Sequence, residues 1–411
     1  MEEKERKPKI RFKGFTEAWE QRKLGDISEI IGGGTPSTNI DEYWNGNINW
    51  YSPAEIGDQI VVNSSQRKIT KLGLEKSSAK MLPKGTVLFT SRAGIGNTAI
   101  LGNSACTNQG FQSIVPDKKQ LDSYFIFSRS KELKDYGERV GAGSTFVEVS
   151  GKQMSEMELL IPNLDEQKTI GCFFKRIDNL ITLHQRKYDK LVNVKKALLE
   201  KMFPKNDSNV PEIRFKGFTE AWEQRKVTDV GKIFIGLVTT MTKNYTDVGT
   251  LLIRNSDIKD NHFEFDSNPI HLDEGFAKSN DSRRMHIGDV VTVHTGDVGT
   301  SAVITEKEDG SIGFATIVTR PNKEIIDSNY LSTYLNTEQH KNWAINQSTG
   351  DGRTNYNLKE FTQLIVPLPS LKEQQCISKY IKQIDNLITL HQRKLEKLKN
   401  IKKSLLEKMF V

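Results

Sequence analysis

The sequence contains little cysteine and no long apolar run. Of its 411 residues only Cys106, Cys172 and Cys376 are cysteines, and no two of them form a CxxC pair, so a disulfide framework is not expected. Cys172 and Cys376 fall in apolar-patterned segments, which predicts buried thiols in a reducing compartment. No apolar run approaches the roughly 20 residues of a membrane helix, and residues 1–10 have no apolar core like that of a signal peptide. We therefore expect a cytoplasmic protein that contacts no membrane.

The sequence also lacks the common catalytic signatures. It has no GxxxxGKS/T loop and no HExxH, the signatures of P-loop ATPases and zinc proteases. Residues 94–99 fit GxGxxA, but a dinucleotide site needs that turn to open a helix, and the Ala-Ile-Leu-Gly that follows is more typical of a hairpin. Asp117, Glu132 and Lys134 resemble a loose nuclease site, yet residues two apart on a helix do not share a face. We therefore expect no catalytic residue, no metal site and no cofactor in this chain.

The charge balance is moderately basic. The chain has 59 Lys and Arg against 52 Asp and Glu, which gives a formal net charge of +7. Such an excess favours polyanionic partners without identifying one. The length allows two or three domains, each with its own core.

Two segments of the chain occur twice. IRFKGFTEAWEQRK begins at Ile10 and again 203 residues later at Ile213, and IDNLITLHQRK begins at Ile177 and again 207 residues later at Ile384. The stretches between the copies barely match, and the linker PKNDSNVP at residues 204–211 separates the two halves. The duplicated segments predict a shared scaffold, whereas the divergent stretches predict two domains that bind different targets.

Each half is expected to end in a long amphipathic helix. Asn163 and Ser370 each follow a proline and stand three residues before a glutamate, which is typical of a helix start with a capping box. Apolar residues then recur at steps of three and four for about 40 residues, or roughly 60 Å at about 1.5 Å per residue. So long a stripe needs a partner, and we expect the helices to pair as an antiparallel coiled coil with pseudo-twofold symmetry. Two separate helices, each packed on its own domain, are the alternative.

The expected pairing stripe contains one histidine in each helix. A polar residue in such a seam commonly fixes its register, and we expect His184 and His391 to do so. The stripe comprises Ile177, Ile181, His184, Tyr188, Leu191 and Leu198 in the first helix and Ile384, Ile388, His391, Leu395, Leu398 and Leu405 in the second.

The regions between the helices are rich in β-branched strands and glycine turns. Residues 85–96 align with residues 288–299 as a strand followed by a glycine-rich turn, and short helices are expected at residues 123–136 and 328–345. The predicted fold class is α/β (α+β), with two β-rich globular domains separated by two long antiparallel helices. The expected segments are residues 1–160 for the first globular domain, 161–210 for the first helix, 211–366 for the second domain and 367–411 for the second helix.

Loops of both globular domains contain side chains suited to DNA. Hydroxyl and amide groups commonly bind phosphates, arginine suits guanine and asparagine suits adenine. Ordinary polar loops are the alternative at every position, and Trp44 and Trp50 are expected to pack the domain rather than to stack on bases. The candidates are Thr35, Ser37, Arg67, Lys68, Ser91 and Arg92 in the first domain and Thr240, Lys243, Asn244, Tyr245, His294, Thr295, Arg353, Asn355 and Tyr356 in the second.

These segments carry a family resemblance that covers the whole chain in order. The repeated GFTEAWEQRK, the stretch from GGTPS to YWNGNINW and the helices that follow PNLDEQ and PSLKEQ resemble the specificity subunit of type I restriction–modification systems. The resemblance implies two target-recognition domains, each recognising one half of an asymmetric, interrupted site in double-stranded DNA. It also implies two long antiparallel helices that act as a spacer.

The resemblance further implies a non-catalytic subunit whose partners perform the chemistry. Two modification (methyltransferase) subunits would bring S-adenosylmethionine and methylate adenine on each strand, and restriction subunits would add ATP-driven translocation and cleavage. S-adenosylmethionine, ATP and Mg²⁺ are therefore expected on the partner subunits and none of them in this chain. A two-headed protein-interaction adaptor that recognises no DNA is the alternative.

Overall fold

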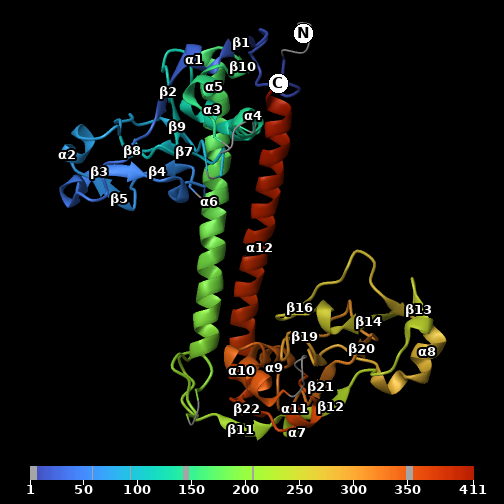
Figure 1. Ribbon diagram of the computed structural model, residues 1–411. Helices are drawn as coiled ribbons and strands as arrows, with labels where there is room; N and C mark the ends of the chain where they lie inside the picture. Colours follow the sequence, from blue (N-terminus) through green and yellow to red (C-terminus); the bar gives the residue numbers. More distant parts are fainter. Residues whose placement is uncertain (1–6, 58, 93, 142–147, 206–207, 349–354) are drawn as a thin grey trace. The chain divides into compact units, whose positions relative to one another are not determined.

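The chain forms two compact units (Figure 1). The computed structural model describes residues 7–57, 59–92, 94–141, 148–205, 208–348 and 355–411. Unit 1 contains Met1–Gln185 and Arg393–Val411, and unit 2 contains Arg186–Gln392. Each unit therefore combines one β-rich region with parts of both long helices, α6 (Leu164–Lys201) and α12 (Leu371–Met409). The predicted α+β class, with two β-rich domains and two long helices, is confirmed.

Unit 1 contains a larger and a smaller sheet besides a short strand pair. The pair joins β1 (Glu20–Lys23) antiparallel to β10 (Glu158–Ile161), directly before α6. The larger sheet has the order β2 (Ser28–Gly32), β9 (Gln112–Pro116), β6 (Val87–Phe89), β7 (Thr98–Leu101) and β4 (Val61–Val62), and the smaller has the order β5 (Arg67–Ile69), β3 (Trp44–Tyr51) and β8 (Cys106–Thr107). The short helices are α1 (Leu24–Ile27), η2 (Asp41–Tyr43), η3 (Pro53–Glu55), α2 (Lys71–Glu75), α3 (Ser123–Ser128), α4 (Ser130–Gly141) and α5 (Gly151–Ser155).

Unit 2 is built in the same way. Its strand pair joins β11 (Glu223–Lys226) antiparallel to β22 (Ile365–Leu368), directly before α12. One sheet has the order β12 (Gly231–Ile235), β21 (Ile317–Pro321), β18 (Val290–Thr292) and β19 (Ser301–Val303); another has the order β13 (Tyr245–Thr246), β17 (His271–Leu272), β14 (Thr250–Arg254) and β20 (Ile312–Phe314); β15 (Ile258–Lys259) pairs with β16 (His262–Phe263). The short helices are α7 (Val227–Val230), η4 (Thr242–Asn244), η5 (Asn255–Asp257), α8 (Glu274–Ser279), η6 (Asp281–Arg283), α9 (Ser328–Leu335), α10 (Glu338–Gln347) and α11 (Leu358–Phe361).

The strand order shows that the two units share a topology. The arrangement β12-β21-β18-β19 in unit 2 corresponds to β2-β9-β6-β7 in unit 1, and β14 runs parallel to β20 as β3 does to β8. The central strands are continuous apolar runs because both faces of the sheet are covered. Val87 and Phe89 pack in the core with Trp19, whereas Leu88 packs in a second core with Tyr51.

Residues of the copied segments attach each β-rich region to a long helix. The guanidinium of Arg11 donates from Nε and Nη2 to the carboxylate of Glu166, both at 2.7 Å, and Arg214 binds Glu373 in the same way at 2.7 and 2.8 Å. Both glutamates are buried. The predicted helix starts are correct, since Asn163 Oδ1 accepts from Glu166 N at 3.0 Å, but the carboxylate of Glu166 binds the arginine.

A buried glutamine completes this attachment in both units. Gln167 Oε1 accepts from Asp122 N at 3.0 Å, at the residue that caps α3, and Gln374 Oε1 accepts from Asp327 N at 2.8 Å, at the residue that caps α9. We use the term joint for the residues that attach each β-rich region to the long helices, including a tryptophan described below. The joint comprises Arg11, Trp19, Glu166 and Gln167 in unit 1 and Arg214, Trp222, Glu373 and Gln374 in unit 2.

The tryptophan of each joint packs against the end of a long helix. In unit 1 the ring of Trp19 lies 6.1 Å from that of Phe410, which directly follows α12. In unit 2 the ring of Trp222 lies 6.1 Å from that of Phe203, which follows α6. Each core is therefore closed by the end of one long helix and the start of the other.

In both units the two long helices run antiparallel, as predicted. In unit 1 Lys402 Nζ lies 2.6 Å from Asp178 Oδ1, and in unit 2 Lys195 Nζ lies 2.6 Å from Asp385 Oδ1. Nearer the end of α12, Phe410 stacks on Phe174, so the numbering rises on one helix as it falls on the other. The predicted pairing residues are buried at Ile177, Ile384 and Leu395 and half-buried at Ile181, His184, Tyr188, Leu191, Leu198, Ile388, His391, Leu398 and Leu405.

The prediction for two of the cysteines is wrong. Cys172 and Cys376 are exposed, and only the thiol of Cys106 is buried. Successive residues on a helix point about 100° apart. Gly171 and Ile377, their neighbours, face the cores, so the adjacent cysteines face outward.

Candidate functional site

The turn after β6 presents Arg92 beside two loops of unit 1. Gly96 N donates to Thr90 O at 2.9 Å, and Gly94 and Gly96 have φ values of 101° and 93°, which favour glycine. A Cβ on Gly96 would also lie 2.4 Å from the side chain of Lys134. The geometry of this turn therefore depends on both glycines.

Arg92 is oriented by neighbours that are distant in sequence. Its Nη2 donates to the backbone carbonyl of Gln109 at 2.9 Å and lies 3.3 Å from Glu148 Oε1. The side chain of Gln109 accepts from the hydroxyl of Thr35 at 2.5 Å. The structure thus brings together the predicted Thr35 and Arg92 and adds Gln109 and Glu148, which the sequence did not indicate.

The loop that carries Thr35 and Ser37 is held by two indoles. Trp50 Nε1 donates to Gly34 O at 2.8 Å, and Trp44 Nε1 donates to Ser37 O at 3.0 Å. Both rings are buried, which confirms that they pack the domain. The guanidinium of Arg67 lies 3.7 Å from the centre of the Trp44 ring, so this exposed arginine is stacked in place. Lys68, also predicted, is half-buried on β5 opposite Asn49.

Unit 2 contains a comparable group of side chains after β18. Thr295 Oγ1 donates to Asn355 Oδ1 at 3.0 Å and lies 2.8 Å from His294 Nδ1. Because the hydroxyl proton goes to Asn355, Thr295 accepts from Nδ1–H of the imidazole. Asn255 Oδ1 accepts from His294 N at 2.8 Å, and Asn255 was not a predicted residue. Burial lowers the pKa of His294 below its ordinary value, so this ring is neutral at pH 7.

We refer to these groups as the strand-end clusters. They comprise Thr35, Arg92, Gln109 and Glu148 in unit 1 and Asn255, His294, Thr295 and Asn355 in unit 2. All are exposed or half-buried, so their polar groups face solvent at least in part.

The second predicted loop of unit 2 belongs to another part of the unit. Thr240 and Lys243 are exposed, and Asn244 and Tyr245 are half-buried around η4 and β13. Tyr245 packs with Met241 and Leu272 in a small core of its own.

Two of the predicted contact residues are in the interior. Ser91 is fully buried, and its backbone bonds both neighbouring loops. Ser91 N donates to Gly110 O, and Ser91 O accepts from Val149 N. Tyr356 is fully buried against Phe361, with its hydroxyl 3.3 Å from His340 Nε2. Neither side chain is placed to contact a ligand, because each fills the core beneath a strand-end cluster. Arg353, also predicted, lies outside the described residues.

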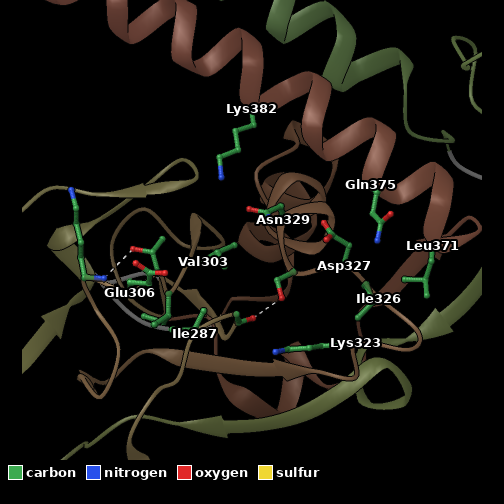
Figure 2. Close-up of a pocket in the computed structure, with 15 residues that line it drawn as sticks. Ile287, Val303, Glu306, Lys323, Ile326, Asp327, Asn329, Leu371, Gln375 and Lys382 are labelled. Atoms are coloured by element: carbon green, nitrogen blue, oxygen red, sulfur yellow. Dashed lines mark hydrogen bonds between the residues drawn. The ribbon is translucent and has the colours of Figure 1, made fainter.

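A separate pocket in unit 2 lies between the starts of α9 and α12 (Figure 2). Figure 2 shows Lys382 and Gln375 on α12 and Asp327 and Asn329 at the start of α9. The carboxylate of Asp327 accepts from Tyr330 N at 2.8 Å, so it caps α9. Both lysines and acidic side chains line the pocket. No residue of the strand-end clusters or of the joint is among the lining residues.

The described residues form no group of three or more His, Cys, Asp or Glu side chains that could hold a metal ion. Within the same residues, no helix is both long and apolar enough to cross a bilayer.

Comparison with known proteins identifies one family. The model described as "Type I restriction modification DNA specificity domain" matches residues 16–193 and 219–400. The type I restriction enzyme MjaIX specificity subunit of Methanocaldococcus jannaschii is 33% identical over 227 residues, which cover 53% of this chain and about half (52%) of that relative's length. The putative type I restriction enzyme MjaX specificity subunit of the same organism is 25% identical over 421 residues. The alignment covers 95% of this chain and 92% of that relative's length.

A solved structure shares the fold. It is the type I restriction-modification system S subunit from M. genitalium, with a TM-score of 0.60 over 98% of this chain and 99% of that one. The sequence identity is 14%, so this similarity concerns the fold alone.

Proposed function

Because this chain belongs to the family of type I restriction–modification DNA specificity domains, we propose that it is the DNA-sequence-specificity subunit of a type I restriction–modification complex. The subunit is non-catalytic and acts in the cytoplasm. The observation that carries the proposal is the family match to both halves of the chain, together with two units that share one topology and differ in their strand-end clusters.

The proposed target is a bipartite, asymmetric site in double-stranded DNA. Residues 22–160 recognise one half and residues 225–366 recognise the other. The halves differ in sequence because the strand-end clusters differ in chemistry. The proposed half-site centres lie about one helical turn of DNA apart, roughly 10 base pairs.

The proposed protein partners are two modification (methyltransferase) subunits and the restriction subunits. The copied segments leave the same leucines exposed on both helices: Leu180 and Leu183 in unit 1 and Leu387 and Leu390 in unit 2, each about 45% exposed. Exposed apolar side chains that recur identically suit two copies of one partner. S-adenosylmethionine, ATP and Mg²⁺ are assigned to these partners.

A domain exchange tests the proposal. The chain is co-expressed with its methyltransferase, and methylated positions are mapped by sequencing the host DNA. Replacing residues 22–160 by the equivalent segment of another specificity subunit should change one half of the methylated site and leave the other intact. A change in both halves would refute the modular assignment. Co-purification of the methyltransferase without sequence-specific methylation would instead favour a protein-interaction adaptor.

A further inference from the structure

The turns that follow β6 and β18 have the same backbone geometry. Gly96 N donates to Thr90 O at 2.9 Å in unit 1, and Gly299 N donates to Val293 O at 3.1 Å in unit 2. Both glycines have positive φ values, 93° and 86°. The two turns are therefore equivalent positions of the shared fold.

A second loop approaches each turn through an equivalent backbone bond. Val149 N donates to Ser91 O at 3.0 Å, and Tyr356 N donates to His294 O at 2.8 Å. Arg92, which follows Ser91, therefore lies beside Glu148, which precedes Val149. In the same way Thr295, which follows His294, lies beside Asn355, which precedes Tyr356. The fold places a pair of side chains across these loops in each unit.

The side chains on this shared frame differ between the units. In unit 1 the pair is Arg92 and Glu148, 3.3 Å apart, and in unit 2 it is Thr295 and Asn355, joined by a hydrogen bond of 3.0 Å. At the joint, by contrast, both the frame and the residues are the same. At these positions the backbone geometry is the same in both units, whereas the side chains differ. Such positions are suited to the recognition of different ligands by one fold.

Resting on the proposed function, we propose that positions 92 and 148 in unit 1 and positions 295 and 355 in unit 2 are equivalent specificity-determining positions. Arg92, oriented by Glu148, recognises a guanine in one half-site, and Asn355, oriented by Thr295, recognises an adenine in the other.

The hydrogen-bonding groups match these bases. Both bonds of Arg92 involve Nη2, so Nη1 keeps its protons for an acceptor of guanine, O6 or N7. Asn355 Oδ1 accepts one bond from Thr295 and retains a second lone pair. Its amide can therefore accept from N6 and donate to N7 of adenine.

The test uses the assembled complex of this chain with its methyltransferase and a DNA library randomised over both half-sites. Bound sequences are selected and counted. Arg92→Gln should reduce the preference for guanine at one position roughly 5- to 150-fold, because loss of recognition at one base pair of a specific site costs about 1–3 kcal/mol. Asn355→Asp should do the same for adenine in the other half-site. Lys118→Gln, an exposed change in unit 1 with the same loss of charge, is the control and should leave every preference unchanged.

Three outcomes would overturn the inference: unchanged preferences in both variants, altered preferences in both half-sites from one variant, or loss of all DNA binding by a complex that still assembles. Glu148→Gln gives a second arm, and melting temperatures verify that all variants are folded. If the unaltered complex selects no bipartite sequence at all, the proposed function itself fails, and this result is distinct from the other three.

Discussion

Asp178 and Lys402 are distant in sequence and form an ion pair of 2.6 Å, and Tyr124 donates to the second oxygen of the same carboxylate at 2.8 Å. The equivalent pair in unit 2 joins Asp385 and Lys195, also at 2.6 Å. The side chain of Asp178 is 5% exposed and that of Asp385 is 26% exposed. One repeated interaction therefore exists in a buried and a more solvated form.

This difference predicts unequal stability effects. Lys402→Met should lower the free energy of unfolding by about 2–3 kcal/mol, because it leaves a buried carboxylate with Tyr124 as its remaining partner. Lys195→Met should cost less, since water reaches Asp385. Denaturant unfolding of both variants measures the difference. Adding Asp178→Asn to Lys402→Met should recover part of the loss, and equal effects of the two single variants would contradict the argument.

The exposed leucines predict how many partners bind. Replacing Leu180 and Leu183 by glutamate should prevent one methyltransferase subunit from docking and leave the other, because unit 2 keeps Leu387 and Leu390. The mass of the purified complex should fall by one subunit. The same replacement in both units should leave the chain alone. Retention of two subunits by the doubly altered chain would show that docking occurs elsewhere.

The long helices predict the gap between half-sites. A heptad inserted after Gln185 in α6 and another after Gln392 in α12 keeps the apolar stripe and adds about 10 Å, or about three base pairs. The methylated site should keep both half-sequences and gain a longer gap. A matched insertion of two residues, which rotates the following turns by about 200°, breaks the stripe and serves as the control. An unchanged gap after the heptad insertions would refute the spacer role.

Unit 2 should lose stability in acid through His340. Its Nδ1–H donates to Leu335 O at 2.7 Å, and burial lowers its pKa to about 4. In the unfolded chain this imidazole has an ordinary pKa of about 6.5. Between pH 6.5 and pH 4 it is therefore protonated in the unfolded chain and neutral in the folded chain. Stability that is fully present above pH 6.5 is therefore lost as the pH falls towards 4, by about 3 kcal/mol in total.

His340→Gln isolates this effect, because the carboxylates titrate equally in both proteins. The variant should be less stable at pH 7, and the difference should shrink at pH 4.5. Melting curves at the two pH values measure it, and a constant difference would contradict burial of a neutral imidazole.

Regular features of the structure could be predicted from the sequence. The long helices begin at Leu164 and Leu371, directly after the expected caps, because periodicity and capping are local signals. The helices expected at residues 123–136 and 328–345 are each interrupted, at Arg129 and Asn336. The side-chain amide of Asn336 accepts from the backbone N of Ser301 and donates to its backbone O. The buried guanidinium of Arg129 donates to the backbone O of Leu160. These tertiary partners are invisible to a local pattern.

The candidate site was predictable only in part. Polar loop composition indicated Thr35, Arg92, His294, Thr295 and Asn355, and the structure groups them as described. Glu148, Gln109 and Asn255 gave no signal, because their contacts depend on the path of loops that are distant in sequence. The same composition wrongly suggested that Tyr356 is a surface residue, although its ring fills the core.

The joint has a consequence at the level of the gene. The joint uses the same four residue types in both units, Arg, Trp, Glu and Gln, so this part of the attachment is the same at both places. A crossover between the two coding repeats would transplant a complete β-rich region and restore the contacts of the joint without further mutation. Under the proposed function, new sequence preferences would therefore arise by recombination, while the paired helices are inherited intact.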